Sequence, residues 1–371
     1  MLKMATNSIT NIKSVILCKD TQISMFKEHQ PYIYRCLELA KKGIFEALPN
    51  PSVGAVIVYN GLIIGEGSTS KYGGPHAEVN AINSVKNLEL LSKSILYVSL
   101  EPCSHFGKTP PCADLIIKMN IPKVVIGITD PFSKVCGQGI AKLKHAGIEV
   151  IVGVLEDKCK ELNKRFLTLH QKQRPYIILK WAQTLDGFIA PINSENHKVF
   201  WISNSYSQQL VHKWRSEEVA FLVGTKTVES DNPSLTTRSW FGKNPLRIFI
   251  DRTGNLAQSY SLKNQEAKTL CFTENPNAIN NEHLIHIQID FSENIIPQIC
   301  ETLFQMQIAS IVIEGGLKTL QSFIDLDYWD EARIFTSQNI LIKGIKSPIL
   351  NKYNKVVVQK LDSDILTIKY H

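Results

Sequence analysis

The sequence has no run of about 20 apolar residues, the length that a membrane-spanning helix needs. Its N-terminus also has no positive patch followed by an apolar stretch and a small-residue cleavage site, which is the pattern of a secretory signal. These two absences argue against a transmembrane protein and against secretion. We therefore expect a cytoplasmic protein that has no membrane partner.

Clusters of like charge are missing as well. The 371 residues include 41 Lys+Arg and 34 Asp+Glu, a formal net charge of +7 that is spread along the chain. The sequence has no basic arm and no basic, aromatic-rich stripe, so we expect no nucleic-acid partner. The eight cysteines are scattered, which argues against a disulfide framework and for reduced thiols that are available as metal ligands.

The length of 371 residues indicates two or three domains. From residue 31 onward, strands alternate with helices, and "VYNGLII" is typical of two strands joined by a hairpin turn at Asn60-Gly61. The alternation predicts a mainly parallel sheet in a layered α/β domain, and a second α/β series follows Pro175. We expect an N-terminal extension over residues 1–28, a first domain over 29–174 and a second domain over 175–371.

A histidine and two cysteines lie at the ends of successive α/β elements. His76 opens a predicted helix in "GGPHAEVNAINSV", while Cys103 and Cys112 each follow a proline in "SLEPCSHFGKTPPCADLII". A catalytic Zn²⁺ site needs three nitrogen or sulfur ligands and an open fourth position. We therefore predict one zinc ion per chain, held by His76, Cys103 and Cys112. Glu78 is the predicted catalytic residue, as the proton shuttle of a zinc deaminase.

Each of these residues has an ordinary structural explanation when it is taken alone. An acidic residue favours the first turn of any helix, and a His-x-Glu pair is common. A structural zinc site or an RNA-binding module would use similar residues, but a structural zinc site closes its coordination shell with a fourth protein ligand. The combination of His-Ala-Glu, Pro-Cys and Pro-Pro-Cys favours the catalytic metal site.

Several stretches of the first half carry a more specific resemblance. They are "PNPSVGAVIV", "HAEVNAI" and "LEPCSHFGKTPPC", continued by "DPFSKVCGQGI" and "LNKRFL". Together they resemble the deaminase part of the bifunctional deaminase/reductases of riboflavin biosynthesis. The resemblance implies a cytidine-deaminase-like three-layer fold and hydrolytic loss of an amino group, as ammonia, from 2,5-diamino-6-(5-phosphoribosylamino)pyrimidin-4-one. It also implies that Asn50 holds the pyrimidine, although Asn50 is equally well explained as a turn residue before Pro51.

The second half contains a glycine pair at a predicted strand-to-helix junction. In "IVIEGGLKTL", Gly315 and Gly316 end a strand and open a helix, where backbone N–H groups can approach a phosphate. This is not the GxGxxG pattern of a Rossmann domain, and a glycine pair is also common in simple tight turns. Arg215 and Arg238 can bind phosphate through paired N–H groups, but each is also an ordinary surface residue when taken alone.

Together with "LKWAQTLDGFIA", "FWIS" and "LVGTKTVESDNPSLTTR", this junction resembles the reductase domain of the same family. The resemblance implies a dihydrofolate-reductase-like fold and NADPH-dependent reduction of the ribosyl group to a ribityl group. It implies that Lys180, Asp231 and Glu314 are catalytic and polarise or protonate the opening ribose. The residues implied at the NADPH site are Trp201, Thr227, Asp231, Gly315, Gly316, Leu317, Lys318 and Thr319. Those implied at the substrate are Arg215, Leu235, Arg238 and Glu314.

Three positions of the second half keep alternatives open. Val199 stands where the family often has a small polar residue, which leaves open a deaminase whose reductase-like domain is inactive or altered. Lys180 has an alternative as a surface charge at a strand end, and Asp231 as a turn residue. The resemblance implies a small phosphorylated pyrimidine as the substrate, and we expect a homo-oligomer.

Overall fold

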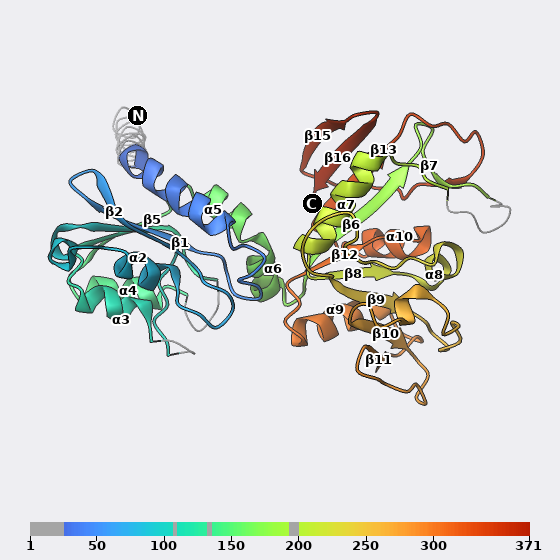
Figure 1. Ribbon diagram of the computed structural model, residues 1–371, viewed down its shortest axis with the longest axis horizontal. Coiled ribbons are helices and arrows are strands. Elements are labelled where there is room, and N and C mark those ends of the chain that lie inside the picture. The colour runs from blue at the N-terminus through green and yellow to red at the C-terminus, as the bar shows by residue number, and fades with distance from the viewer. Residues whose placement is uncertain (1–25, 107–109, 132–135, 193–199) are drawn as a thin grey trace, which may run out of the picture. The chain divides into compact units, whose positions relative to one another are not determined.

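The computed structural model describes residues 26–106, 110–131, 136–192 and 200–371 (Figure 1). The chain divides into two compact units, Met1–Gln171 and Lys172–His371, and each has its own sheet and apolar core. Most of the expected extension over residues 1–28, and Val199, lie outside the described residues, and the expected domain limits remain predictions. Within the described ranges, no helix is long and apolar enough to cross a membrane.

The first unit is built on a five-stranded sheet with the order β2-β1-β3-β4-β5. Its strands are β1 (Gly54–Tyr59), β2 (Leu62–Ser68), β3 (Ile95–Leu100), β4 (Lys123–Ile128) and β5 (Glu149–Val152). The predicted hairpin is present, because β1 and β2 pair antiparallel around Asn60 and Gly61, whose φ angles of 48° and 78° suit a tight turn.

The expectation of a mainly parallel sheet holds only in part for this first unit. Strand β1 is antiparallel to both β2 and β3, and only the β3–β4 and β4–β5 pairs are parallel. The physical reason is the connection between β2 and β3. The chain leaves β2, passes through a helix and returns on the far side of β1, so β2 and β3 share one direction and β1 runs opposite to both.

Helices cover both faces of this sheet and give three layers (Figure 1). Helices α2 (Ala77–Asn83), α3 (Cys112–Lys118) and α4 (Gln138–His145) lie on one face; a helix over residues 26–41 and α5 (Glu156–Leu162) lie on the other. Two glycines allow the layers to pack closely. A Cβ atom at Gly54 would lie 1.9 Å from the carbonyl oxygen of Cys36, and one at Gly67 would lie 2.4 Å from that of Ala77. Helix α6 (Lys164–Lys172), which the sequence pattern did not predict, follows α5.

The second unit contains a nine-stranded sheet with the order β11-β10-β9-β8-β12-β6-β13-β16-β15. Neighbouring strands from β11 to β13 in this order are parallel, and β16 and β15 add an antiparallel edge. The strands are β6 (Tyr176–Gln183), β8 (Ala220–Val223), β9 (Leu246–Ile250), β10 (Thr269–Thr273), β11 (Leu284–Gln288), β12 (Ser310–Ile313), β13 (Glu331–Thr336), β15 (Lys355–Leu361) and β16 (Asp364–Tyr370). A small ribbon pairs β7 (Phe188–Ala190) with β14 (Ile345–Lys346).

The helices of this unit are α7 (Ser205–Glu217), α8 (Thr225–Asp231), α9 (Ile295–Gln305) and α10 (Leu317–Asp325). Alternate residues of β6 enter different cores: Ile177 and Leu179 pack in one apolar cluster, and Tyr176 and Ile178 pack in the other. This is the pattern of a sheet that is buried on both faces. Helices α8 and α10 begin just after β8 and β12, which are parallel neighbours. Their N-termini therefore open at the same edge of the sheet.

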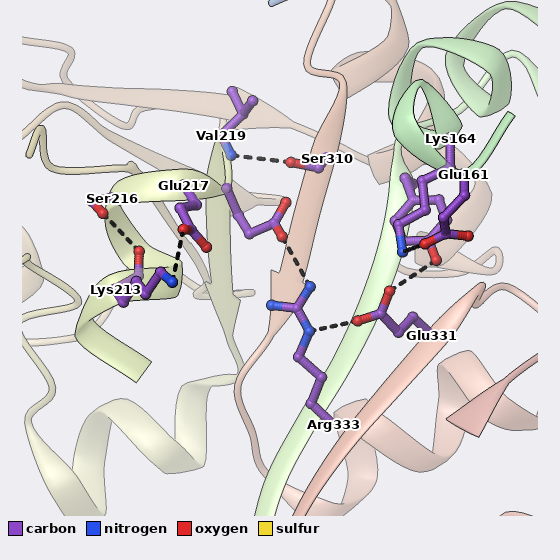
Figure 2. A network of polar contacts seen from close by, with 11 residues as sticks. Glu161, Lys164, Lys213, Ser216, Glu217, Val219, Ser310, Glu331 and Arg333 are labelled. Carbon is purple, nitrogen blue, oxygen red and sulfur yellow. Dashed lines mark hydrogen bonds and ion pairs between the residues drawn. The ribbon is translucent and has the colours of Figure 1, made fainter. Parts of the chain in front are cut away.

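A buried ion network fixes the end of α7 against this sheet, and Figure 2 shows Arg333 at its centre. Arg333 of β13 contacts Glu331 at 2.6 Å and Glu218, the residue after α7, at 3.0 Å. Tyr176 donates a hydrogen bond of 3.0 Å to Glu331, and the Arg333 guanidinium lies 4.5 Å from the centre of the Trp214 ring. Because a buried charge is costly without its partner, the network restricts α7 to one position on the sheet.

Candidate active sites

Three side chains suited to a metal converge in the first unit. His76 is the N-cap of α2, Cys112 is the first residue of α3, and Cys103 lies in the loop after β3. Their ligand atoms all lie within 4.8 Å of one another, and the sulfurs of Cys103 and Cys112 are 3.5 Å and 3.3 Å from His76 Nδ1. One imidazole and two thiols from three elements are a donor set that fits Zn²⁺ and leaves a fourth position open.

The surroundings favour a thiolate in this cluster. A hydrogen bond with Cys112, and then one with His76, outweigh burial and lower the pKa of Cys103 to about 4. The hydrogen bond with Cys103, followed by burial, raises the pKa of Cys112. The Cys112 backbone N–H also donates to the Cys103 sulfur at 3.3 Å. Since the thiolate is the form of cysteine that binds metals, Cys103 is prepared for that role.

Glu78 lies in the first turn of α2, the helix that His76 caps. Its side chain is buried, with 3% of the residue exposed. Burial, and then the charge of Cys103, raise the pKa of Glu78 to about 7. A carboxyl group with a pKa near neutrality can both accept a proton and return it, which a general acid–base must do.

Glu101, which the sequence analysis did not single out, supports the loop that carries Cys103. This residue is 3% exposed and follows β3 directly. Its carboxylate accepts hydrogen bonds of 3.0 to 3.1 Å from the backbone N–H groups of Asp130, Gly137 and Ile140. The available signal was its place two residues before Cys103 in "LEPC".

In the second unit, charged residues from three elements interact in a buried setting. Arg215 of α7 and Glu314, the residue after β12, form an ion pair of 2.8 Å, with 11% and 7% of their side chains exposed. Burial opposes the charge on Glu314, but Arg215 and Lys180 outweigh it and hold the pKa of Glu314 below its usual range. Lys180 of β6 shows the opposite balance: burial lowers its pKa, and the attraction of Glu314 only partly offsets this.

This ion pair also has unused hydrogen-bonding capacity. Among the described residues, Arg215 Nε and Glu314 Oε1 are buried without a hydrogen-bond partner. Buried polar atoms in proteins normally have partners, so these two are open to a polar ligand.

A glycine-lined cradle joins the N-termini of α8 and α10. Gly315 and Gly316 have φ angles of 149° and 54°, which a side chain would strain. A Cβ atom at Gly316 would lie 3.1 Å from Thr227 Oγ1, and one at Gly224 would lie 2.4 Å from Thr319 Oγ1. The two loops therefore approach closely and present hydroxyls and backbone N–H groups, a donor set that fits the phosphates of NADPH. The first turn of α10 also contains Leu317 and Lys318.

The remaining expected residues are less closely tied to these groups. Asn50 is half-buried in the turn before β1, and Trp201 is 63% exposed before α7. Asp231 is exposed at the end of α8, and Arg238 is exposed in the segment that follows α8. Leu235 is wholly buried in a core with a φ angle of 51°, so only its backbone can face a ligand.

Two residues beside the Arg215–Glu314 pair escaped the sequence analysis. His212 of α7 is 9% exposed, and its Nδ1 accepts a hydrogen bond of 3.1 Å from the Arg238 backbone N–H. Thr236 is 3% exposed, its carbonyl accepts from Arg215 at 3.3 Å, and its hydroxyl has no hydrogen-bond partner in the described part of the chain. The available signal was the spacing of His212 and Arg215, because residues three apart share one face of a helix.

Comparisons with known proteins match both units. The family described as "Cytidine and deoxycytidylate deaminase zinc-binding region" matches residues 26–128, and the family described as "RibD C-terminal domain" matches residues 175–341. The riboflavin biosynthesis protein RibD of Aquifex aeolicus is 38% identical over 348 residues, which cover 90% of this chain and 96% of that protein. The RibD protein of Synechocystis is 37% identical over 324 residues, 86% of each chain.

Solved structures show the same relationship. A diaminohydroxyphosphoribosylaminopyrimidine deaminase/5-amino-6-(5-phosphoribosylamino)uracil reductase from Thermotoga maritima is 39% identical with a TM-score of 0.83, over 93% of this chain and 99% of that one. RibD from Acinetobacter baumannii is 32% identical with a TM-score of 0.81, also over 93% and 99% of the two chains.

The fold and the sites define a zinc-dependent deaminase joined to a dihydrofolate-reductase-like reductase that uses NADPH. The chain belongs to the RibD family of riboflavin biosynthesis enzymes. The predicted family, fold class, enzyme class and cofactors are thereby confirmed. Nothing in these matches or in the described residues favours a deaminase whose reductase-like domain is inactive or altered.

Proposed function

We propose that each unit catalyses one of two successive reactions. The first unit removes an amino group hydrolytically from 2,5-diamino-6-(5-phosphoribosylamino)pyrimidin-4-one, and the second reduces the ribosyl group of the product to ribityl with NADPH. The observation that carries this proposal is the presence, in one chain, of a zinc-type ligand cluster beside a buried Glu78 and of a buried Arg215–Glu314 pair.

For deamination, we assign the zinc ligands to His76, Cys103 and Cys112. Bound zinc supplies Lewis-acid activation of a water molecule. Glu78 accepts the proton that this water loses and returns it to the departing amine, which leaves as ammonia. The burial of Glu78 in the first turn of the helix that His76 caps supports this assignment, because it places the carboxyl group beside the three ligands and away from bulk water. We assign Asn50 to the pyrimidine.

For reduction, bound NADPH supplies the hydride. We assign Lys180, Asp231 and Glu314 to the ring-opening of the ribose, which needs a proton donor and a group that stabilises developing charge. The lowered pKa of Lys180 supports its role as the donor, and the nearby carboxylate of Glu314 balances its charge. The residues assigned to NADPH are Trp201, Thr227, Asp231, Gly315, Gly316, Leu317, Lys318 and Thr319. Those assigned to the substrate are Arg215, Leu235, Arg238 and Glu314.

A coupled assay on the purified full chain tests these assignments. We expect ammonia release from the first substrate, followed by NADPH oxidation, and about one zinc ion per chain by elemental analysis. Ammonia release without NADPH oxidation would reduce the proposal to the first unit. Zinc-loaded protein without either activity would overturn it.

We also propose that the chain is a cytoplasmic homo-oligomer. Large apolar side chains are exposed near the C-terminus, among them Ile342 at 87% and Val358 at 64%. Val358 belongs to β15, the last strand in its sheet order, and an exposed apolar edge strand is a usual site of pairing between chains. In sedimentation velocity, the wild type should form at least a dimer and Val358→Lys should weaken it; a monomeric wild type would contradict the proposed oligomer.

The cytoplasmic location is supported by the cysteines. The described cysteines are free thiols, which suits a reducing compartment.

A further inference from the structure

We propose that His212 is a positioning residue of the reductase site, whose neutral imidazole holds the backbone of Arg238 in the conformation that binds the phosphorylated substrate. The proposal rests on the proposed function, because it takes Arg238 as a substrate contact. It adds a residue that makes no assigned contact with substrate or cofactor and that acts through another residue.

Helix α7 holds the segment over residues 236–238 through two side chains. His212 Nδ1 accepts a hydrogen bond of 3.1 Å from the Arg238 backbone N–H, and Arg215 donates to the carbonyl oxygen of Thr236 at 3.3 Å. The segment belongs to no helix or strand, so its path depends on such contacts. Since the Arg333 network fixes α7 on the sheet, the helix is a firm support for the segment.

The contact with Arg238 defines the protonation state that His212 needs. A backbone N–H can only donate, so Nδ1 must be the accepting nitrogen and the ring proton must lie on Nε2. The surroundings favour this neutral form. Burial first, and then the charges of Arg215 on α7 and Arg238 on the segment, lower the pKa of His212. The Thr236 carbonyl and Glu314 at the end of β12 act in the opposite direction, but do not outweigh them.

Protonation of His212 places a second N–H against the Arg238 N–H and breaks the hydrogen bond. The segment then keeps its contact with Arg215 but loses its hold at Arg238. The groups on the segment, Arg238 and the buried hydroxyl of Thr236 among them, then no longer have one fixed position. Because Arg238 is assigned to the substrate and takes no part in bond changes, the effect falls on KM more than on kcat.

Two substitutions separate the acceptor role from simple packing. His212→Ala removes the acceptor, whereas His212→Asn keeps one, because Asn Oδ1 lies as many bonds from the backbone as His Nδ1. For the deaminated substrate, we expect His212→Ala to raise KM about tenfold, the size expected for the loss of one partly buried hydrogen bond, with kcat within about threefold of wild type. KM of His212→Asn should stay within about threefold of wild type. Lys213→Ala, at the partly exposed next position on α7, is the matched control and should change neither constant.

The pH dependence of KM gives a signature that a packing role would not produce. Because burial and the neighbouring arginines lower the pKa of His212, its neutral form is lost only as the pH falls through that lowered pKa. Toward acidic pH, wild-type KM should therefore rise more steeply than KM of His212→Asn, which keeps the titration of the substrate phosphate and of all other groups but lacks that of His212. NADPH binding, followed by fluorescence, shows whether the second unit is folded in each variant.

Two results would overturn the proposal. One is a wild-type KM in folded His212→Ala. The other is an equal rise of KM in the Ala and Asn variants together with the same pH profile in wild type and His212→Asn. If the wild-type chain itself does not reduce the substrate, the proposed function has failed instead.

Discussion

Replacing Glu314 with glutamine tests the electrostatics of the reductase site most directly. The substitution keeps the shape of the side chain and removes a negative charge that interacts with both Arg215 and Lys180. The ion pair joins Arg215 Nη2 to Glu314 Oε2 at 2.8 Å, with 11% and 7% of the side chains exposed. Without that carboxylate, Arg215 and Lys180 repel each other without compensation, and the pKa of Lys180 should fall further because it loses an attractive interaction.

Two magnitudes follow from this geometry. Breaking a buried ion pair costs about 3–5 kcal/mol, because one charge is left without compensation. The glutamine oxygen still accepts a hydrogen bond from Arg215, so the loss in the unfolding free energy of the second unit should lie near the lower end, about 3 kcal/mol. Removing a group that stabilises developing charge in an active site typically slows the reaction about 10²–10³-fold. We therefore expect Glu314→Gln to slow NADPH-dependent reduction by at least about 10²-fold.

The assay follows NADPH absorbance after addition of the deaminated intermediate. Ammonia release from the first substrate should stay near wild type, because the zinc-type cluster lies in the other unit. Glu301→Gln is the matched control, since it makes the same chemical change at an exposed position of α9 and should leave stability and both activities unchanged. If folded Glu314→Gln reduces the intermediate at the wild-type rate, the carboxylate has no electrostatic role in catalysis.

Three further predictions concern the zinc cluster and acid stability. Glu78→Gln should keep zinc and the fold but lose about 10⁴-fold in deamination, since an amide cannot accept the proton; ammonia release within a few-fold of wild type would contradict the shuttle role. Cys103→Ala and Cys112→Ala should each lose zinc and deamination together, and a variant that keeps zinc in elemental analysis would exclude the replaced residue as a ligand. Burial disfavours the charge of Asp330, but the contacts with Arg174 outweigh burial and hold the pKa of Asp330 below 3.8. The charged carboxylate therefore stabilises the fold above pH 3.8, and this stabilisation is lost as the pH falls through the lowered pKa. Asp330→Asn should therefore lower Tm at neutral pH, and its difference from wild type should shrink below about pH 4; a constant difference would contradict this linkage.

The zinc cluster was predictable because its ligands stand at local signals. His76 precedes a short amphipathic run, and Cys103 and Cys112 follow prolines where a strand has ended or a helix begins. Such junctions can be recognised from a few neighbouring residues. Because the three junctions belong to successive elements of one α/β layer structure, few arrangements of the chain would keep the three ligands apart.

The reductase site depends on pairings that periodicity does not encode. Arg215 and Glu314 lie 99 residues apart in the chain, and they meet because α7 is anchored at one end of a sheet in which β12 is central. Lys180 lies near this pair because its strand, β6, is the neighbour of β12 in the sheet. In the chain, however, Lys180 precedes Ser310, the first residue of β12, by 130 positions. The sequence predicts that these strands exist, but the order in which they pair is set by the packing of the whole unit. The position of β1 between β2 and β3, and its antiparallel pairing with β3, were missed for the same reason.

This dependence on packing also explains why His212 was invisible in the sequence. On α7, its spacing from Arg215 indicates only that the two share a helix face, which is equally typical of ordinary core positions. The chemical meaning appears only when the segment after α8 passes close enough for the Arg238 N–H to meet the imidazole. His212 must stay neutral for its Nδ1 to accept this hydrogen bond. Burial and the two neighbouring arginines favour the neutral form, and in the proposal they thereby support substrate binding. Residues of this kind are found by asking where the backbone donors of an irregular segment are satisfied.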